Sequence, residues 1–198
     1  MNEPTPANRP MRADAQRNYA SLLRAARVAI SERGADIVLE DVARSAGVAI
    51  GTLYRHFPTR QDLLEAVFLD EADELREHAE ALASAPVPFD ALMNWLRLQM
   101  DFAAFGRSLG AAIMAAKHVP GTRISDANKA MHQAGEVLLL RAQAAEQIRT
   151  DIHLVDVLRL VYGIVMVNEH ASDPDGATRM FDLVIAGIRT KPKTVNLM

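Results

Sequence analysis

Apolar residues recur at helical spacing along almost the whole chain, and no segment alternates as a half-buried strand would. The first stripe predicts a helix that runs to about Glu32 and stops at Gly34. Two short helices joined at Gly47 are expected next. A long helix then opens on a capping box, with Thr59 as N-cap and Asp62 reaching back to it. The pattern therefore indicates an all-α fold.

The same spacing predicts further helices beyond Pro88, over two stripes between residues 89 and 116 and then over about 124–149 and 154–170. The final helix has clear end signals, because Asp173 is a natural N-cap, Pro174 suits the first helical position and Lys191-Pro192 stops the helix.

The expected helices divide the chain into four parts. Residues 1–12 hold three prolines among polar neighbours, which is typical of a flexible arm. Three helices over 13–58 form a first domain, and a connecting helix covers 59–85. The remaining residues, 86–198, are expected to form a helical C-terminal domain.

The sign of the charge changes along the chain. Residues 1–60 contain nine Arg and no Lys against six carboxylates, a net charge of +3, whereas the whole chain has a net charge of −3 and the remainder therefore −6. A basic end suits a polyanionic partner, because charges attract one another only over short distances at ordinary salt concentration. A solvated arginine-rich helix would give the same count.

The segment 42–60 has the pattern of a helix-turn-helix. Ala43 lets the second helix cross the first closely, Gly47 can adopt the positive φ of the turn, and Leu53 locks the pair together. Polar side chains of the second helix would then face outward, toward phosphates or base edges in a major groove. These residues are Thr52, Tyr54, Arg55 and His56.

The run LEDVARSAGVAIGTLYRHFPTR, residues 39–60, closely resembles the DNA-binding domain of the tetracycline-repressor (TetR) family, and a looser resemblance covers about 12–71. The resemblance implies a homodimer in which three N-terminal helices bind double-stranded DNA and a helical C-terminal domain dimerises and binds a small-molecule effector. We therefore expect a transcriptional repressor that the effector releases from a palindromic operator. The expected DNA-contacting residues are Arg44, Ala49, Ile50, Gly51, Thr52, Tyr54, His56 and Arg60.

One position departs from the family's pattern. Where many relatives have a Ser or Thr that caps the second helix, this chain has Val38, which offers the free amides no acceptor and costs about 1 kcal/mol. Glu40 and Asp41 in the first turn compensate in part through the helix dipole.

The helix that begins at Leu154 is apolar around most of its circumference, so we expect a dimer partner to cover part of it, with an internal core as the alternative. The expected dimerisation residues are Leu158, Val161, Tyr162, Val165, Met180, Leu183, Val184, Gly187 and Ile188. Bulky residues with a few polar ones among them are expected to line the effector cavity, and plain core packing is their alternative. They are Trp95, Phe102, Phe105, Met114, His118, Met131, Met166 and Asn168.

Two sequence patterns could indicate an enzyme, and each is weak evidence. Ser108 lies in a G-x-S-x-G match, but this motif requires a strand before the serine, and the preceding pattern is helical. A metal site at Glu169, His170 and Asp173 is less favoured than a polar helix end. We expect no enzyme activity, cofactor or metal. The remaining alternatives are a helical hydrolase using Ser108 and a DNA-binding dimer without a ligand.

Neither a secretory signal nor an apolar stretch long enough to span a bilayer is apparent in the sequence, which predicts a cytoplasmic protein with no membrane partner. The chain contains no cysteine, which excludes disulfides and thiolate metal sites.

Overall fold

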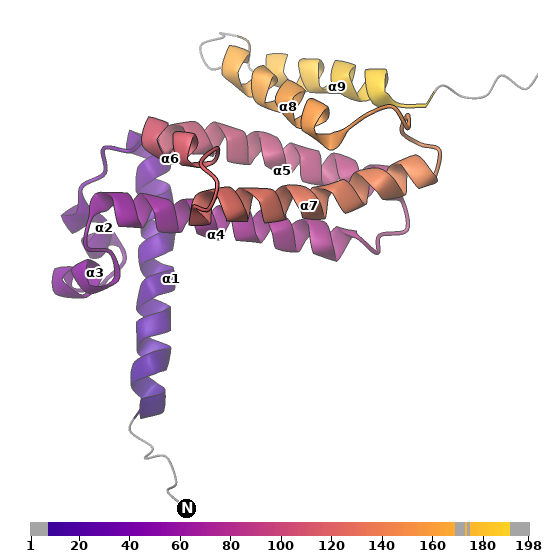
Figure 1. Cartoon of the computed structure of the whole chain (residues 1–198). Coiled ribbons are helices and arrows are strands. Elements are labelled where there is room, and N and C mark those ends of the chain that lie inside the picture. The colour runs from indigo at the N-terminus through magenta and orange to yellow at the C-terminus, as the bar shows by residue number, and fades with distance from the viewer. Residues whose placement is uncertain (1–7, 169–172, 174, 191–198) are drawn as a thin grey trace, which may run out of the picture. The chain divides into compact units, whose positions relative to one another are not determined.

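A computed structural model describes residues 8–168, 173 and 175–190 (Figure 1). This part of the chain is helical without named strands, so the predicted all-α fold is confirmed. The helices are α1 (Asn8–Arg33), α2 (Leu39–Ser45), α3 (Ile50–His56), α4 (Arg60–Leu82), α5 (Pro88–Ser108), α6 (Ala111–Ala116), α7 (Arg123–Ala144), α8 (Leu154–Asn168) and α9 (Gly176–Ile188). Among the described residues no helix is long and apolar enough to cross a membrane.

The chain folds as two compact units whose boundaries differ from the predicted ones. The first unit comprises residues 1–70 and 105–124, and the second comprises 71–104 and 125–198. Residues 105–124, expected in the C-terminal domain, therefore belong with the N-terminal helices. Helix α1 begins at Asn8, inside the predicted arm of residues 1–12, and the arm's Pro4 and Pro6 lie outside the described residues.

In the first unit α1, α2 and α3 pack together (Figure 1). Gly34 takes a φ of 69° and donates its N–H to Ile30 O at 2.8 Å, which ends α1 as predicted. The turn between α2 and α3 is also as predicted, because Gly47 has a φ of 67°. Ala43 O accepts a hydrogen bond from Val48 N at 2.9 Å across this turn, so the first helix of the pair fixes the entry to the second.

In the second unit the later part of α4 lies beside α5 and α7, and the α8–α9 pair lies next to α5, on the side away from α4 (Figure 1). The fully buried Trp95 on α5 donates its indole N–H to Leu75 O on α4 at 3.0 Å. A Cβ at Gly135 on α7 would lie 2.1 Å from the indole ring, so this glycine is what lets α7 approach the tryptophan. Helix α5 also contacts α9, because the guanidinium carbon of Arg97 lies 5.6 Å from the centroid of the Phe181 ring.

Two predicted helix ends were wrong. Helix α7 ends at Ala144 and not near Arg149, because Glu146 takes a φ of 54° and Gln147 N turns back to Ala142 O at 3.0 Å. Helix α9 begins at Gly176 with Asp175 as its N-cap.

The predicted N-cap of α9, Asp173, has a different role. Its carboxylate accepts from Asp175 N at 3.2 Å and pairs with Arg179, so it stabilises the turn before the helix. The hydrogen bond from Arg179 holds the pKa of Asp173 below its usual value. Pro174, Glu169, His170 and the Lys191-Pro192 stop lie outside the described residues.

Candidate nucleic-acid interface

Helix α3 has one buried and one exposed side. Leu53 is fully buried, whereas Ile50 and Tyr54 are 38% and 43% exposed. A Cβ added at Gly51 would meet no atom within 4 Å, so the backbone of the first turn is open to a close-approaching partner. The exposed side of α3 thus offers an apolar side chain, open backbone and a phenol hydroxyl along one helix. A single α-helix of this kind fits in a DNA major groove.

Aromatic packing holds the C-terminal end of α3. The half-buried His56 ring packs edge-on against Tyr19 of α1 at a centroid distance of 5.7 Å, and Tyr19 also contacts Phe57 at 5.3 Å. Burial, followed by the negative charge of Asp70, raises the pKa of Tyr19. These contacts fix the direction of the His56 imidazole, one of the predicted phosphate contacts.

The capping box that opens α4 is confirmed. Asp62 N donates to Thr59 Oγ1 at 3.1 Å, and Thr59 N donates back to Asp62 Oδ2 at 2.9 Å. Arg60 is the first residue of α4, immediately after this cap, so its backbone position is well defined.

The charged and hydroxyl donors at this surface contact the unit's own acceptors. Arg44 donates to Asp41 at 2.9 Å and Arg60 to Asp36 at 3.1 Å. The Tyr54 hydroxyl donates to Glu40 Oε1 at 3.3 Å.

Two further observations concern donors on α3. The negative charge of Glu40 is the main cause that raises the pKa of Tyr54, so the phenol keeps its proton. Arg55, which was expected to face outward with Thr52, Tyr54 and His56, is exposed and donates to Thr52 Oγ1 at 2.8 Å.

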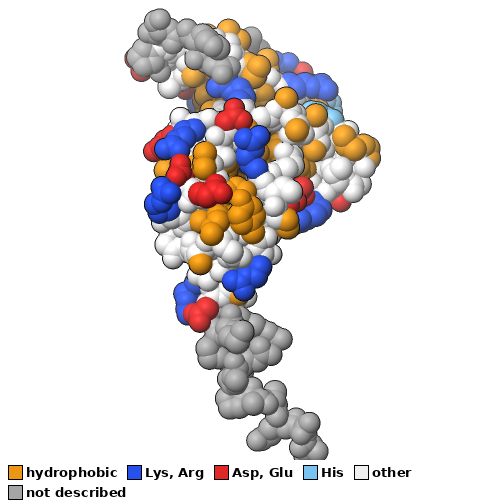
Figure 2. All heavy atoms as spheres, turned by 90° about the vertical axis from the view of Figure 1, so that its left-hand side faces the viewer, with side chains coloured by type: hydrophobic (Ala, Val, Ile, Leu, Met, Phe, Trp, Pro, Cys, Tyr) orange, Lys and Arg blue, Asp and Glu red, His pale blue; other side chains and the backbone are white. Residues whose placement is uncertain are grey.

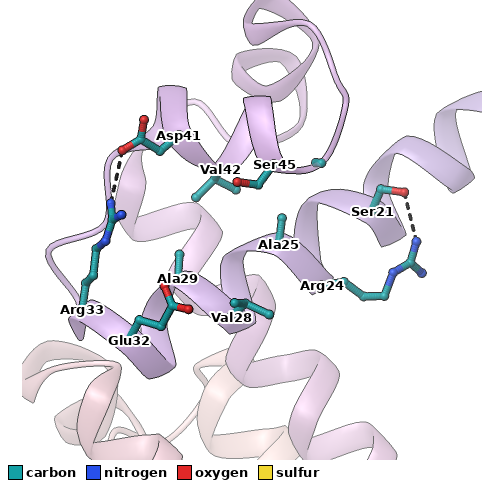
Figure 3. A pocket seen from close by; sticks show the side chains of 11 residues that line it. Ser21, Arg24, Ala25, Val28, Ala29, Glu32, Arg33, Asp41, Val42 and Ser45 are labelled. Carbon is teal, nitrogen blue, oxygen red and sulfur yellow. Dashed lines mark hydrogen bonds and ion pairs between the residues drawn. The ribbon is translucent and has the colours of Figure 1, made fainter.

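A groove of about 400 Å³ lies between α1 and α2 (Figure 3). It is hollow because the facing side chains are small, with Ala25 and Ala29 on α1 opposite Ser45 on α2. Arg33 crosses from α1 to Asp41 at 3.2 Å. Asp41 is therefore shared between an arginine of α1 and Arg44 of its own helix.

The predicted effector residues are divided between the two units. Phe105, Met114 and His118 belong to the first unit, and the others belong to the second. His118 and Met166 are exposed, so the structure does not support a lining role for either. Asn168 donates to Ile164 O of its own helix at 2.9 Å.

The sequence did not predict that three polar residues of the second unit form a partly buried chain. The Tyr162 hydroxyl donates to Oε1 of the fully buried Gln99 at 3.0 Å, and His132 Nε2 lies 3.4 Å from the same hydroxyl. Burial raises the pKa of Tyr162, so its hydroxyl stays protonated. The Nε2 atom of Gln99 has no hydrogen-bond partner among the described residues. The available signal was a lone amide in the apolar stripe of α5, three residues after Leu96.

The predicted dimerisation residues fall on both sides of α8 and α9. Four of them, Leu158, Val161, Val165 and Ile188, are buried within the protomer and belong to its core. The side chains of these four residues are therefore less available to a partner than the exposed members of the predicted set. Tyr162 and Val184 are half-buried.

The remaining predicted positions are exposed, together with two apolar residues that were not predicted. We call this set the α8–α9 surface, and its members are Leu160, Val167, Met180, Leu183 and Gly187.

Ser108, the alternative nucleophile, is the last residue of α5 and is followed by Gly110 with a φ of 88° before α6. In the described part of the chain it lies at a junction of two helices, and the strand that the nucleophile elbow requires does not precede it.

Known proteins match both parts of the chain. Residues 22–67 match the model of the bacterial regulatory proteins of the tetR family, and residues 87–190 match the C-terminal domain of SbtR-like transcriptional regulators. The chain belongs to the TetR family. The resemblance seen in residues 39–60 is thus confirmed, and the protein is a transcriptional regulator with a helix-turn-helix DNA-binding domain.

Solved structures of TetR-family regulators are similar to this chain over most of its length. The TetR regulator SCO0520 from Streptomyces coelicolor is 35% identical, with a TM-score of 0.73 over 87% of this chain and 99% of that one. A TetR regulatory protein from Mycobacterium vanbaalenii is 30% identical, with a TM-score of 0.69 over 91% of this chain and 99% of that one. A search of curated proteins gives no significant match.

The start of α2 lacks a side-chain cap, as the sequence predicted. Val38 has extended geometry, with φ −97° and ψ 119°, and makes no cap hydrogen bond. We expect Val38→Ser to stabilise the protein by about 0.5–1 kcal/mol, because the hydroxyl can accept from a free amide of the first turn. Urea denaturation measures the gain, and Val38→Ala controls for loss of the exposed valine. Equal stability of the two variants would contradict the capping argument.

Proposed function

We propose that this TetR-family regulator is a homodimeric repressor that binds a palindromic operator through α3 and leaves it when a small molecule binds the second unit. The observation that carries the DNA-binding part is the exposed side of α3, where Ile50, Gly51 and Tyr54 are open while Leu53 anchors the helix. Two copies related by a two-fold axis would read two inverted half-sites, which is why the operator should be palindromic.

The α8–α9 surface supports the dimer. Leu183 is 72% exposed and Val167 is 69% exposed, on adjacent packed helices. Large exposed apolar side chains on neighbouring helices favour a protein–protein interface. Two helices from each copy would form a four-helix interface, and the partner would cover the residues that the protomer leaves exposed.

The polar chain of Gln99, Tyr162 and His132 supports an effector. A buried amide nitrogen without a partner, such as Gln99 Nε2, destabilises a fold by about 1–3 kcal/mol. Native proteins seldom contain such a group without a structural or functional cause. A ligand oxygen that accepts from Gln99 Nε2 would explain why this nitrogen has no partner within the protein. FadR from Bacillus subtilis, which has the same fold at 16% identity and a TM-score of 0.55 over 86% of this chain and 99% of that one, was solved with stearoyl-CoA.

Removing the Tyr54 hydroxyl tests the DNA-binding role. We expect Tyr54→Phe to lose about 0.5–1.5 kcal/mol of binding free energy, because one hydrogen bond is removed without a change in packing. The loss should be equal on an operator and on unrelated DNA, since phosphate contacts carry no sequence information. Fluorescence anisotropy titrations over a range of salt concentrations measure both. Affinity that does not fall with salt would count against phosphate contacts.

Placing a charge on the α8–α9 surface tests the dimer. Leu183→Arg should weaken dimerisation about tenfold or more without unfolding the protomer, because the side chain is outside its core. Thr178→Arg adds the same side chain at an exposed polar position of α9 and is the control. Sedimentation velocity over a concentration series distinguishes them, and an unchanged Leu183→Arg dimer would refute this placement.

Replacing the unpartnered amide tests the effector site. Gln99→Leu should raise the free energy of unfolding by about 1 kcal/mol, because a buried donor without a partner is removed. Tyr162→Phe should lower it, since both ends of the Gln99 amide are then unpaired. Compounds that release the wild type from DNA should fail to release Gln99→Leu. A chemical screen that finds no releasing compound would favour the ligand-independent dimer.

A further inference from the structure

The DNA-facing donors of the first unit are held by carboxylates of the same unit. Arg44 bonds Asp41, Arg60 bonds Asp36 and Tyr54 bonds Glu40. Carboxylate oxygens accept the hydrogen bonds that phosphate oxygens would accept. Figure 2 accordingly shows basic and acidic side chains next to one another on the visible face, and no continuous basic patch.

The three carboxylates differ in what they hold. Asp41 also accepts from Arg33 on α1, so it joins α1 to α2 whether or not Arg44 is present. The Asp36 side chain is 90% exposed and lies between helices, so it can move away with little cost. Glu40 is different, because it stands in the first turn of α2 and reaches across to the hydroxyl of Tyr54 on α3.

The Glu40–Tyr54 contact orients a DNA-facing donor in the absence of DNA. Tyr54 is exposed, and the negative charge of Glu40 raises the pKa of its hydroxyl, which is protonated at neutral pH in any case. A phosphate that took this hydrogen bond would lie beside the Glu40 carboxylate, and two negative charges that close repel one another. The carboxylate must therefore give up its donor and move aside when DNA binds.

We propose that Glu40 is an intramolecular substitute for a DNA phosphate: it holds the Tyr54 hydroxyl until a phosphate replaces it, and so lowers the affinity for every DNA sequence. This inference rests on the proposed binding of DNA by α3. It assigns a role in setting affinity to a residue that itself makes no contact with DNA.

Glu40→Ala removes both the charge and the competing acceptor. We expect it to bind a short mixed-sequence duplex about two- to fivefold more tightly than the wild type, the range for an exposed pair. Glu32→Ala is the matched control, because Glu32 is an exposed carboxylate of the same unit on the rim of the α1–α2 groove. If the two variants gain equally, net charge alone explains the effect and the inference is overturned.

A double-mutant cycle with Tyr54→Phe separates the specific contact from general charge. In the wild type part of the Tyr54–phosphate gain is offset by the lost Glu40 bond, so Tyr54→Phe should weaken binding about twofold more in the Glu40→Ala background. Independent effects of the two changes would overturn the inference. Wild-type protein that binds no duplex at low salt would instead overturn the proposed function.

A second variant guards against misfolding. Glu40→Gln keeps the side-chain volume and removes only the charge, so it should also bind the mixed-sequence duplex more tightly than Glu32→Gln. Circular dichroism confirms that each variant is folded before titration. A folded Glu40→Gln that binds no better than Glu32→Gln would contradict the proposal independently of Glu40→Ala.

Discussion

Helix α3 has seven residues, and a helix this short is not stable alone in water, so the DNA-facing surface depends on how the rest of the unit holds it. Leu53 and Phe57 are buried on its inner side, and Gly47 turns the chain so that this side meets α2. Tyr19 adds an aromatic contact from α1. Because the anchors lie at the middle and the end of α3, its opposite side is free for DNA without loss of packing.

Two features of the described part of the second unit carry the functional argument. Leu183 and the other members of the α8–α9 surface are apolar and exposed, whereas Gln99 is polar and buried without a partner for Nε2. Each arrangement costs stability in an isolated protomer, and proteins retain such costs mainly where a partner or ligand removes them. The Trp95–Gly135 contact, by contrast, is ordinary close packing in the core of this unit.

The sequence was informative where local chemistry decides the structure. Glycines at positions that need positive φ, such as Gly34 and Gly47, and the reciprocal cap of Thr59 and Asp62 are read from a few neighbouring residues. The exposed positions of α3 that we propose to face DNA were predicted from spacing and family resemblance together. Which carboxylate each donor bonds did not follow, because those contacts join different helices.

Tertiary packing determines which apolar residues are buried and where α9 begins, and the sequence alone did not predict these features. Helix α8 is apolar on nearly every side, so nothing local distinguishes the buried Leu158 from the exposed Leu160. Trp95 fits an effector cavity as well as a core by composition, and only its packing against Gly135 assigns it to the core. Helix α9 begins later than predicted because the Asp173 carboxylate accepts from the amide two residues on. Such a side chain can stabilise a turn or cap a helix, and the sequence pattern alone does not decide between the two.

The central claim is that the outer side of α3 reads DNA in a two-fold arrangement. Selection of bound duplexes from a random-sequence pool by the purified full-length protein tests it most directly. We expect enrichment of one sequence with two inverted half-sites, and loss of that enrichment when Leu183→Arg separates the subunits. A pool that stays random after repeated rounds, or that converges on a single unrepeated site, would contradict it.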